Sequence, residues 1–278
     1  MADLIKLGPR LNCIASLIGY KARLADIGTD HAYLPIVLCE QGKIESAVAI
    51  DLNYSPYQTA LAAVQNHKLT RKIDVRLGDG LQPLLPGEID TIALAGMGGK
   101  TMLEILFARP DILSEVSDLI VQPQGLESKV RYDLLEAGWL LREEHLAEEG
   151  RVYVVMAFSR KTGCSKQEVL KLEELWIKQI ISVSKTITPK SSELTFSRSG
   201  ENEIDLVRSL FWRFGPLILQ FPDHLLQRLI QEYREELTFR VEQMKKSQSI
   251  SVQMRRQEIL LELNYLEVIT KLLFDELS

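Results

Sequence analysis

The sequence has few cysteines, no long apolar run and no excess of positive charge. Its three cysteines, Cys13, Cys39 and Cys164, are odd in number and widely spaced, without a Cys-x-x-Cys pair. This spacing argues against a disulfide framework or a zinc site and favours a reducing compartment. No segment approaches the ~20 apolar residues that a membrane-spanning helix needs, and residues 1–6 lack a signal-peptide pattern. We therefore expect a soluble, cytoplasmic protein without a metal ion.

The net charge of −5 is unevenly distributed along the chain. Residues 1–160 contain 16 Lys and Arg against 21 Asp and Glu, whereas residues 161–278 contain 17 of each. All of the net negative charge therefore lies in the first part. Because the protein as a whole does not attract phosphates, any nucleic-acid partner must be bound by a local basic patch.

Short apolar strands alternate with helical segments over the first 160 residues. Strands are expected at 23–27, 46–51, 73–77, 89–95 and 118–122, followed by an antiparallel pair at 139–145 and 151–159. This alternation is typical of a doubly wound α/β domain with a mainly parallel sheet. We predict a Rossmann-like domain over residues 1–162.

The pattern changes to helical periodicity over residues 163–278, where we expect an all-α domain. Apolar spacing predicts a helix around 169–183, and the Ser/Thr/Pro/Lys-rich residues 182–200 predict a loop. Residues 211–216 are predicted to form a turn whose aromatic side chains fill a space in the packing.

Two longer apolar stripes, at 226–244 and 252–273, predict an antiparallel helical hairpin with coiled-coil-like packing. Basic residues gather where the two helices meet, and others precede them in the expected loop. The first group contains Arg240, Lys245, Lys246, Arg255 and Arg256, and the second Lys185, Lys190 and Arg198. Such charges usually form a solvated face, but here they are the best candidates for gripping a nucleic acid.

Acids or glycines follow each of the first four expected strands. They are Asp26 and Gly28, then Asp51, then Asp79 and Gly80, and finally Gly96-Met97-Gly98-Gly99. The carboxyl ends of parallel strands meet at one edge of the sheet, which is where such folds bind nucleotides. There Asp51 is placed to accept ribose hydroxyls, and Asp79 to accept an adenine amine.

The first of these turns lacks the glycines of a dinucleotide site. A G-x-G-x-x-G motif would seat a pyrophosphate, but Asp30 and Ala32 stand where further glycines would be. Because Asp30 would repel a pyrophosphate, we expect a nucleoside with a cationic or zwitterionic tail. Acids at three strand ends followed by a glycine cluster are the pattern of a class I S-adenosylmethionine-dependent methyltransferase. The predicted cofactor-binding residues are Asp26, Gly28, Asp30, His31, Asp51, Asp79, Gly80, Gly96, Met97 and Gly98.

Longer motifs narrow this resemblance. Residues 26–35 (Asp-Ile-Gly-Thr-Asp-His-Ala-Tyr-Leu-Pro), residues 92–99 (Ile-Ala-Leu-Ala-Gly-Met-Gly-Gly) and Gln122-Pro123 resemble the bacterial tRNA (adenine(22)-N1)-methyltransferases. The likeness continues through residues 55–58 (Ser-Pro-Tyr-Gln) and 214–216 (Phe-Gly-Pro). That family usually has glutamate where this chain has Asp51, and asparagine where it has Gln124.

The resemblance implies transfer of a sulfonium methyl group to N1 of adenine 22 in the tRNA D-loop. N1 carries an in-plane lone pair, so no proton has to leave first and catalysis rests on positioning. Asp30 and His31 are the implied catalytic residues, and Asp30 serves either the adenine N6 amine or the methionine amine. The implied substrate-binding residues are Arg10, Tyr33, Met97, Gly99, Gln124, Lys245, Lys246, Arg255 and Arg256.

Other functions remain open from the sequence. The same cofactor site would serve another RNA, a protein or a small-molecule acceptor, and a non-catalytic adaptor would retain only the fold. An oxidoreductase is disfavoured by the missing G-x-G-x-x-G motif. We expect a monomer or weak homodimer with no DNA partner.

Overall fold

The computed structural model describes residues 5–187 and 200–274. The chain divides into two compact units, Met1–Lys166 and Gln167–Ser278. None of the helices within the described residues is long and apolar enough to cross a membrane.

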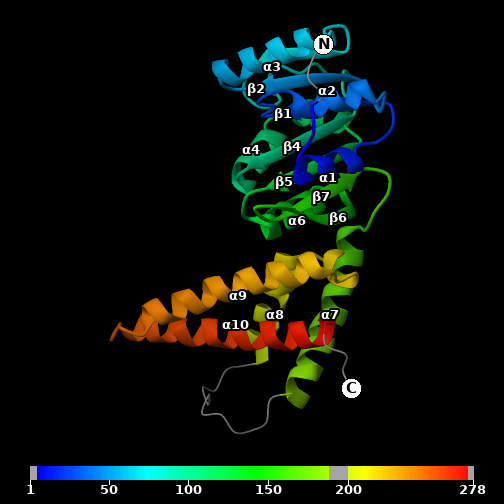
Figure 1. The fold of residues 1–278 in the computed structure, drawn as a ribbon. Coiled ribbons are helices and arrows are strands. Elements are labelled where there is room, and N and C mark those ends of the chain that lie inside the picture. Colours follow the sequence, from blue (N-terminus) through cyan, green and yellow to red (C-terminus); the bar gives the residue numbers. More distant parts are fainter. Residues whose placement is uncertain (1–4, 188–199, 275–278) are drawn as a thin grey trace. The chain divides into compact units, whose positions relative to one another are not determined.

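The first unit is built on a seven-stranded sheet with the order β3-β2-β1-β4-β5-β7-β6 (Figure 1). Its strands are β1 (Ala22–Ile27), β2 (Ile44–Asp51), β3 (Ile73–Leu77), β4 (Thr91–Met97), β5 (Asp118–Pro123), β6 (Leu140–Glu149) and β7 (Arg151–Ser159). Strands β1 to β5 are parallel, whereas β7 runs antiparallel to both β5 and β6. The predicted Rossmann-like fold is therefore confirmed, and β7 lies between β5 and β6.

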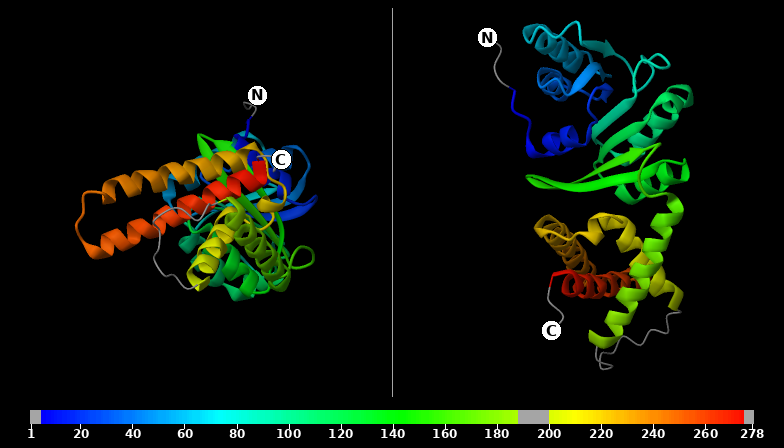
Figure 2. Two further views of the ribbon diagram at one scale, coloured as in Figure 1. Left: turned by 90° about the horizontal axis from the view of Figure 1, so that it is seen from below. Right: turned by 90° about the vertical axis from the view of Figure 1, so that its right-hand side faces the viewer.

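Helices cover both faces of this sheet, with α1, α2 and α3 on one face and α4 and α6 on the other (Figures 1 and 2). Their bounds are α1 (Pro9–Leu17), α2 (Tyr33–Glu40), α3 (Tyr54–Asn66), α4 (Gly99–Phe107), α5 (Pro110–Glu115) and α6 (Glu127–Glu136). The central strands are buried on both faces, which explains their near-continuous apolar sequences. The short helix α5 was not predicted.

In the second unit, the regular elements of the described residues are all helices. It contains α7 (Lys166–Ile187), α8 (Gly200–Phe214), the 3₁₀ turn η1 (Ile218–Gln220), α9 (His224–Met244) and α10 (Ile250–Phe274). Asp223 caps the N-terminus of α9, because its carboxylate accepts a hydrogen bond from the backbone N–H of Leu226 at 2.9 Å. Helices α9 and α10 lie side by side as the predicted antiparallel hairpin (Figures 1 and 2). The coiled-coil detail of their packing stays a prediction.

Two predictions for this unit are wrong. The expected loop at 182–200 begins too early, because residues 182–187 continue α7, while residues 188–199 lie outside the described part of the chain. The expected aromatic turn at 211–216 is mostly helical, since Phe211–Phe214 form the last turn of α8. Only Gly215, with φ of +107°, and Pro216 turn the chain there.

Candidate active site

The carboxyl ends of the parallel strands bring the predicted residues to one edge of the first unit. The pairing register places Ile27 beside both Ile50 and Leu94, and Asp51 beside Leu77. The turns that follow these strands therefore surround β1, with the β2 and β3 turns on one side and the β4 turn on the other.

The turn after β1 has an unusual backbone. Gly28, Asp30 and Ala32 have φ values of +74°, +53° and +56°, although Asp and Ala rarely adopt this left-handed region. The neighbouring strand holds the turn in place, because the N–H groups of Gly28 and Thr29 donate to the Ile50 carbonyl at 2.9 and 3.0 Å. A Cβ atom at Gly28 would lie 3.0 Å from the Met97 methyl carbon. Glycine thus suits both the left-handed backbone of the turn and the close approach of Met97.

Asp26 supports this turn from inside the protein. Its side chain is buried, and its Oδ2 accepts a hydrogen bond from the Thr29 hydroxyl at 2.5 Å. Burial is the main cause that raises the pKa of Asp26 to about 6; the Thr29 hydrogen bond opposes the shift, and the nearby Asp51 charge adds to it. Asp26 therefore fixes the shape of the turn.

Asp51 joins the turns after β1 and β2. Its Oδ2 accepts the backbone N–H of Asp30 at 3.2 Å, and its Oδ1 accepts that of Asn53 at 2.9 Å. Asp79, after β3, is exposed. Within the described residues, none of the acids Asp26, Asp30, Asp51 and Asp79 pairs with Lys or Arg. We call these four the strand-end acids, and their uncompensated charge fits a cationic nucleoside cofactor better than a pyrophosphate.

Asp30, His31 and Tyr33 form an exposed row beside Gly28. The Asp30 carboxylate lies 3.3 Å from Nε2 of His31, with 66% and 41% of the two side chains exposed. The His31 ring stacks on the Tyr33 ring with centroids 5.0 Å apart and planes 18° apart. The two predicted catalytic side chains are thus adjacent, and an aromatic surface lies next to them.

The glycines predicted for the site differ in what surrounds them. Gly96, with φ of +78°, is exposed at the end of β4, and Gly98 is exposed at the start of α4. Gly99 is buried, and a Cβ atom there would lie 2.7 Å from the Gly125 carbonyl oxygen. A Cβ atom at Gly80 would lie 2.8 Å from the Ile105 side chain. Close packing therefore favours glycine at Gly99, and at Gly80 a left-handed φ of +53° favours it as well.

Arg10 lies next to the open end of β4. Its Nη1 donates to Oε1 of Gln122 at 3.0 Å, and the same oxygen accepts the Gly96 N–H at 3.1 Å. Its Nε donates to Oε2 of Glu149 at 3.1 Å. A Cβ atom at Gly96 would lie 3.7 Å from Nη1 of Arg10 and 3.9 Å from Nε2 of Gln124. The predicted substrate residues Arg10 and Gln124 thus flank Gly96.

Gln122 and Glu149 are site residues that the sequence interpretation missed. Gln122 is completely buried and connects the Gly96 backbone to Arg10. The Gln122-Pro123 motif drew attention to this position, but it did not indicate which groups Gln122 contacts. Glu149 carried no local signal.

The basic residues of the hairpin tip lie in the second unit and differ in their pairing. Lys245 pairs with Glu242 at 2.5 Å and Arg255 with Glu258 at 2.8 Å. Lys246 and Arg256 form no ion pair within the part of the chain described. Residues 239–258 contain five Lys and Arg against two Glu. Of the other cations, Lys185 is on α7, and Lys190 and Arg198 lie outside the described residues.

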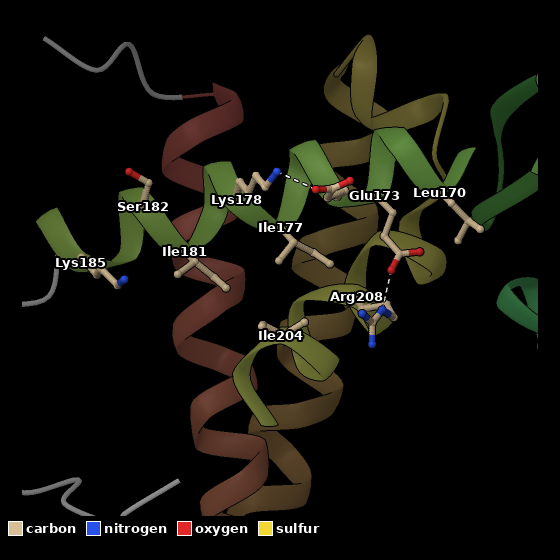
Figure 3. Close-up of a pocket in the computed structure, with 10 residues that line it drawn as sticks. Leu170, Glu173, Ile177, Lys178, Ile181, Ser182, Lys185, Ile204 and Arg208 are labelled. Carbon is tan, nitrogen blue, oxygen red and sulfur yellow. Dashed lines mark hydrogen bonds and ion pairs between the residues drawn. The ribbon is translucent and has the colours of Figure 1, made fainter. Parts of the chain in front are cut away.

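A groove of about 630 Å³ lies between α7 and α8, within the second unit (Figure 3). Its apolar lining includes Leu170, Ile177 and Ile204, and Arg208 pairs with Glu173 at its side. None of the predicted cofactor residues lines it, so the candidate active site remains the strand edge. Among the described residues, no group of His, Cys, Asp or Glu is arranged to hold a metal ion.

Comparison with known proteins adds to this geometry. The sequence profile of a family described as "Methyltransferase domain" matches residues 7–156. The tRNA (adenine(22)-N(1))-methyltransferase of Bacillus subtilis (strain 168) is 38% identical over 153 residues. That alignment covers 55% of this chain and 64% of the relative, so it stops short of two thirds of the relative's length.

Several solved structures match nearly the whole chain, among them these two. The crystal structure of the B. subtilis m1A22 tRNA methyltransferase has a TM-score of 0.70 and 25% identity, covering 96% of this chain and 100% of that chain. A Streptococcus pneumoniae protein, solved in complex with S-adenosyl-L-methionine, has a TM-score of 0.69 and 27% identity, covering 95% and 99%.

Proposed function

The chain belongs to the methyltransferase-domain family, and from this premise we propose that it transfers a methyl group from S-adenosylmethionine to N1 of adenine 22 in tRNA. The observation that carries the proposal is the set of strand-end acids around the open Gly28 turn. Their negative charge favours a ligand that carries a positive sulfonium, and carboxylate oxygens at these places can accept hydrogen bonds from its ribose hydroxyls and adenine amine. The similarity to the B. subtilis enzyme supports the choice of acceptor.

We assign the cofactor residues by their place on the strand edge. Asp51, buried at the end of β2, would accept the ribose hydroxyls, and Asp79, exposed after β3, the adenine amine. Gly28, Gly96 and Gly98 would let the backbone approach the ligand closely, with Met97 covering it. Asp26 would act indirectly, by fixing the turn through Thr29.

The residues that would bind the target adenine are those of the exposed row beside this site, Asp30, His31 and Tyr33. When bound, S-adenosylmethionine supplies an electrophilic methyl group: the N1 lone pair forms the new bond, and the sulfur keeps the electrons of the broken one and leaves as a thioether. Tyr33 would stack on the flipped adenine. Asp30 would accept a hydrogen bond from N6 and stabilise the positive charge that develops on the ring, while His31 holds Asp30 in place.

The second unit would provide part of the tRNA-binding surface. Lys246 and Arg256 carry charges that no described carboxylate neutralises, and Lys245 and Arg255 would add to them. Phosphates bind such cations through electrostatic attraction and counterion release. We also propose a cytoplasmic location, where tRNA occurs, and action as a monomer or weak homodimer.

Methyl-labelled cofactor and unmodified tRNA transcripts test the proposal. We expect label in a native transcript and none in one that carries guanine at position 22. Equal labelling of both transcripts would contradict the proposed position. Cofactor binding without label in any tRNA would instead indicate another acceptor.

A further inference from the structure

The turn between β6 and β7 carries arginine and tyrosine residues next to the active-site edge. Strand β7 runs antiparallel to β5 with Val121 beside Met156, so the first residues of β7 extend past the carboxyl end of β5. Arg151 and Tyr153 are among these first residues, directly after Gly150, which turns the chain with φ of +78°. Helix α1 brings Arg10 to the same place.

Arg10, Tyr153 and Arg151 form a compact cluster, which we call the Arg–Tyr–Arg cluster. The guanidinium carbons of Arg151 and Arg10 lie 4.7 and 5.6 Å from the centroid of the Tyr153 ring. Both distances are within the range of cation–π attraction. The Tyr153 ring therefore contacts two positive groups, one from α1 and one from β7.

The two arginines differ in how many of their hydrogen-bond donors are used. Arg10 uses Nε and Nη1 on Glu149 and Gln122, and its side chain is 21% exposed. Arg151 is exposed and forms no ion pair with any described residue. Arg10 is thus a fixed group, whereas the guanidinium fork of Arg151 is available to a ligand.

A guanidinium stacked on an aromatic ring is a strong phosphate ligand, because its planar fork is already oriented and matches two phosphate oxygens. A target base that enters the site has to leave the RNA stack, so its flanking phosphates pass over the rim of the site. Arg10 is on that rim, beside Gly96.

We propose that the Arg–Tyr–Arg cluster binds backbone phosphates next to the target nucleotide, with Arg151 as the main phosphate ligand. This inference rests on the proposed function, since it takes the acceptor to be RNA. It gives the acidic first unit its own RNA contact, separate from the helical hairpin. Glu149 and Tyr153 are then positioning residues, because they act through the arginines.

Arg151→Ala tests the proposal, with Arg71→Ala as the matched control. Arg71 is an exposed arginine just before β3, at the opposite end of the parallel strands. The dissociation constant for unmodified tRNA is measured for the full chain over a range of salt concentrations. The affinity for S-adenosylmethionine is measured alongside.

We expect Arg151→Ala to weaken tRNA binding about five- to tenfold and to reduce the salt slope by about one. The affinity for S-adenosylmethionine should not change, and Arg71→Ala should match the wild type in its affinity for tRNA. Arg151→Lys should regain part of the affinity, since it restores the charge without the fork. Unchanged tRNA affinity in Arg151→Ala, or an equal loss in Arg71→Ala, would overturn the proposal.

The wild-type protein separates this result from failure of the proposed function. If it binds tRNA but transfers no methyl group, the proposed activity fails, while the comparison of Arg151→Ala with Arg71→Ala still decides the cluster's role. If it does not bind tRNA, both proposals are overturned.

Discussion

Asp26, near the end of β1, and Asp30, in the turn that follows, lie four residues apart, but their surroundings give them different roles. Asp26 is buried against the Thr29 hydroxyl, whereas two thirds of the Asp30 side chain is exposed beside His31. A buried acid shapes the protein at a cost in stability, and an exposed acid is available to a ligand. We therefore expect a substitution at Asp26 to change the stability of the protein, and a substitution at Asp30 to change its activity.

Asp26→Asn should change how stability depends on pH. The pKa of Asp26 is about 6 in the folded protein and close to 3.8 when unfolded. Between these values the folded state binds more protons, so wild-type stability falls as the pH rises and levels off above 6. Relative to Asp26→Asn, the wild type should lose about 2 kcal/mol of unfolding free energy between pH 4.5 and 7.5.

Urea unfolding of the two proteins at both pH values measures this difference. Because other titrating groups affect both proteins equally, only the difference between the two profiles matters. Parallel profiles would contradict the account of Asp26.

Asp30→Asn should impair activity without affecting folding. The side chain is exposed and its only ion-pair partner among the described residues is His31, so the melting temperature should stay close to that of the wild type. Removing the charge that stabilises the developing adenine cation should lower kcat about 100-fold. Single-turnover methyl transfer at saturating tRNA measures this effect. A variant with wild-type kcat would exclude Asp30 from the chemistry.

At the scale of elements, the hairpin formed by α9 and α10 allows ion-paired and unpaired basic residues to be compared within one protein. Among the residues that the structure describes, Lys246 and Arg256 have no ion-pair partner, whereas Lys245 and Arg255 are paired with Glu242 and Glu258. Unpaired cations gain more from a phosphate, because no existing partner has to be released.

The double variant Lys246→Ala/Arg256→Ala should therefore weaken tRNA binding more than Lys245→Ala/Arg255→Ala. We expect about a 20-fold loss for the first and less than fivefold for the second. Filter binding at a single salt concentration compares them, with circular dichroism to check that the helices are retained. Equal affinity of both variants and the wild type would show that the hairpin tip does not hold tRNA.

Regular elements were predictable where apolar periodicity was strong. The strands and the α9–α10 hairpin follow directly from spacing in the sequence. Helix α8 as a whole was not predicted, because residues 182–200 read as a loop and Gly215-Pro216 reads as a chain break. Its buried residues nevertheless have helical spacing: Val207, Leu210, Phe211 and Phe214. The end of α7 was missed because Ser and Thr favour loops. There Ser184 is buried in the helix, and its hydroxyl donates to the Ile181 carbonyl.

The candidate site was predictable only where its residues are local in sequence. Asp26, Gly28 and Asp51 could be placed because each ends a parallel strand or follows directly after one. The contacts of Arg10 could not, because they join residues 112 and 139 positions apart. Such pairs depend on how β7 and β6 are ordered in the sheet, and alternation along the chain does not fix that order.

At the scale of the whole molecule, the net negative charge lies in one part of the chain, and this affects the binding of the cofactor and of RNA in opposite ways. Residues 1–160 carry the entire net charge of −5, and the strand-end acids are within them. Negative charge there favours a cationic cofactor but repels RNA phosphates. Under the proposed function, RNA binding would therefore depend on small basic groups, the hairpin tip in one unit and the Arg–Tyr–Arg cluster in the other.

The central claim is that this chain methylates N1 of adenine 22 in tRNA, and locating the product methyl group tests it most directly. A methyl group on N1 blocks Watson–Crick pairing, so reverse transcription of the reacted tRNA stops there. We predict a new stop at adenine 22 that requires S-adenosylmethionine and is absent with Asp30→Asn. A stop at another nucleotide, or methylated tRNA without any new stop, would contradict the account.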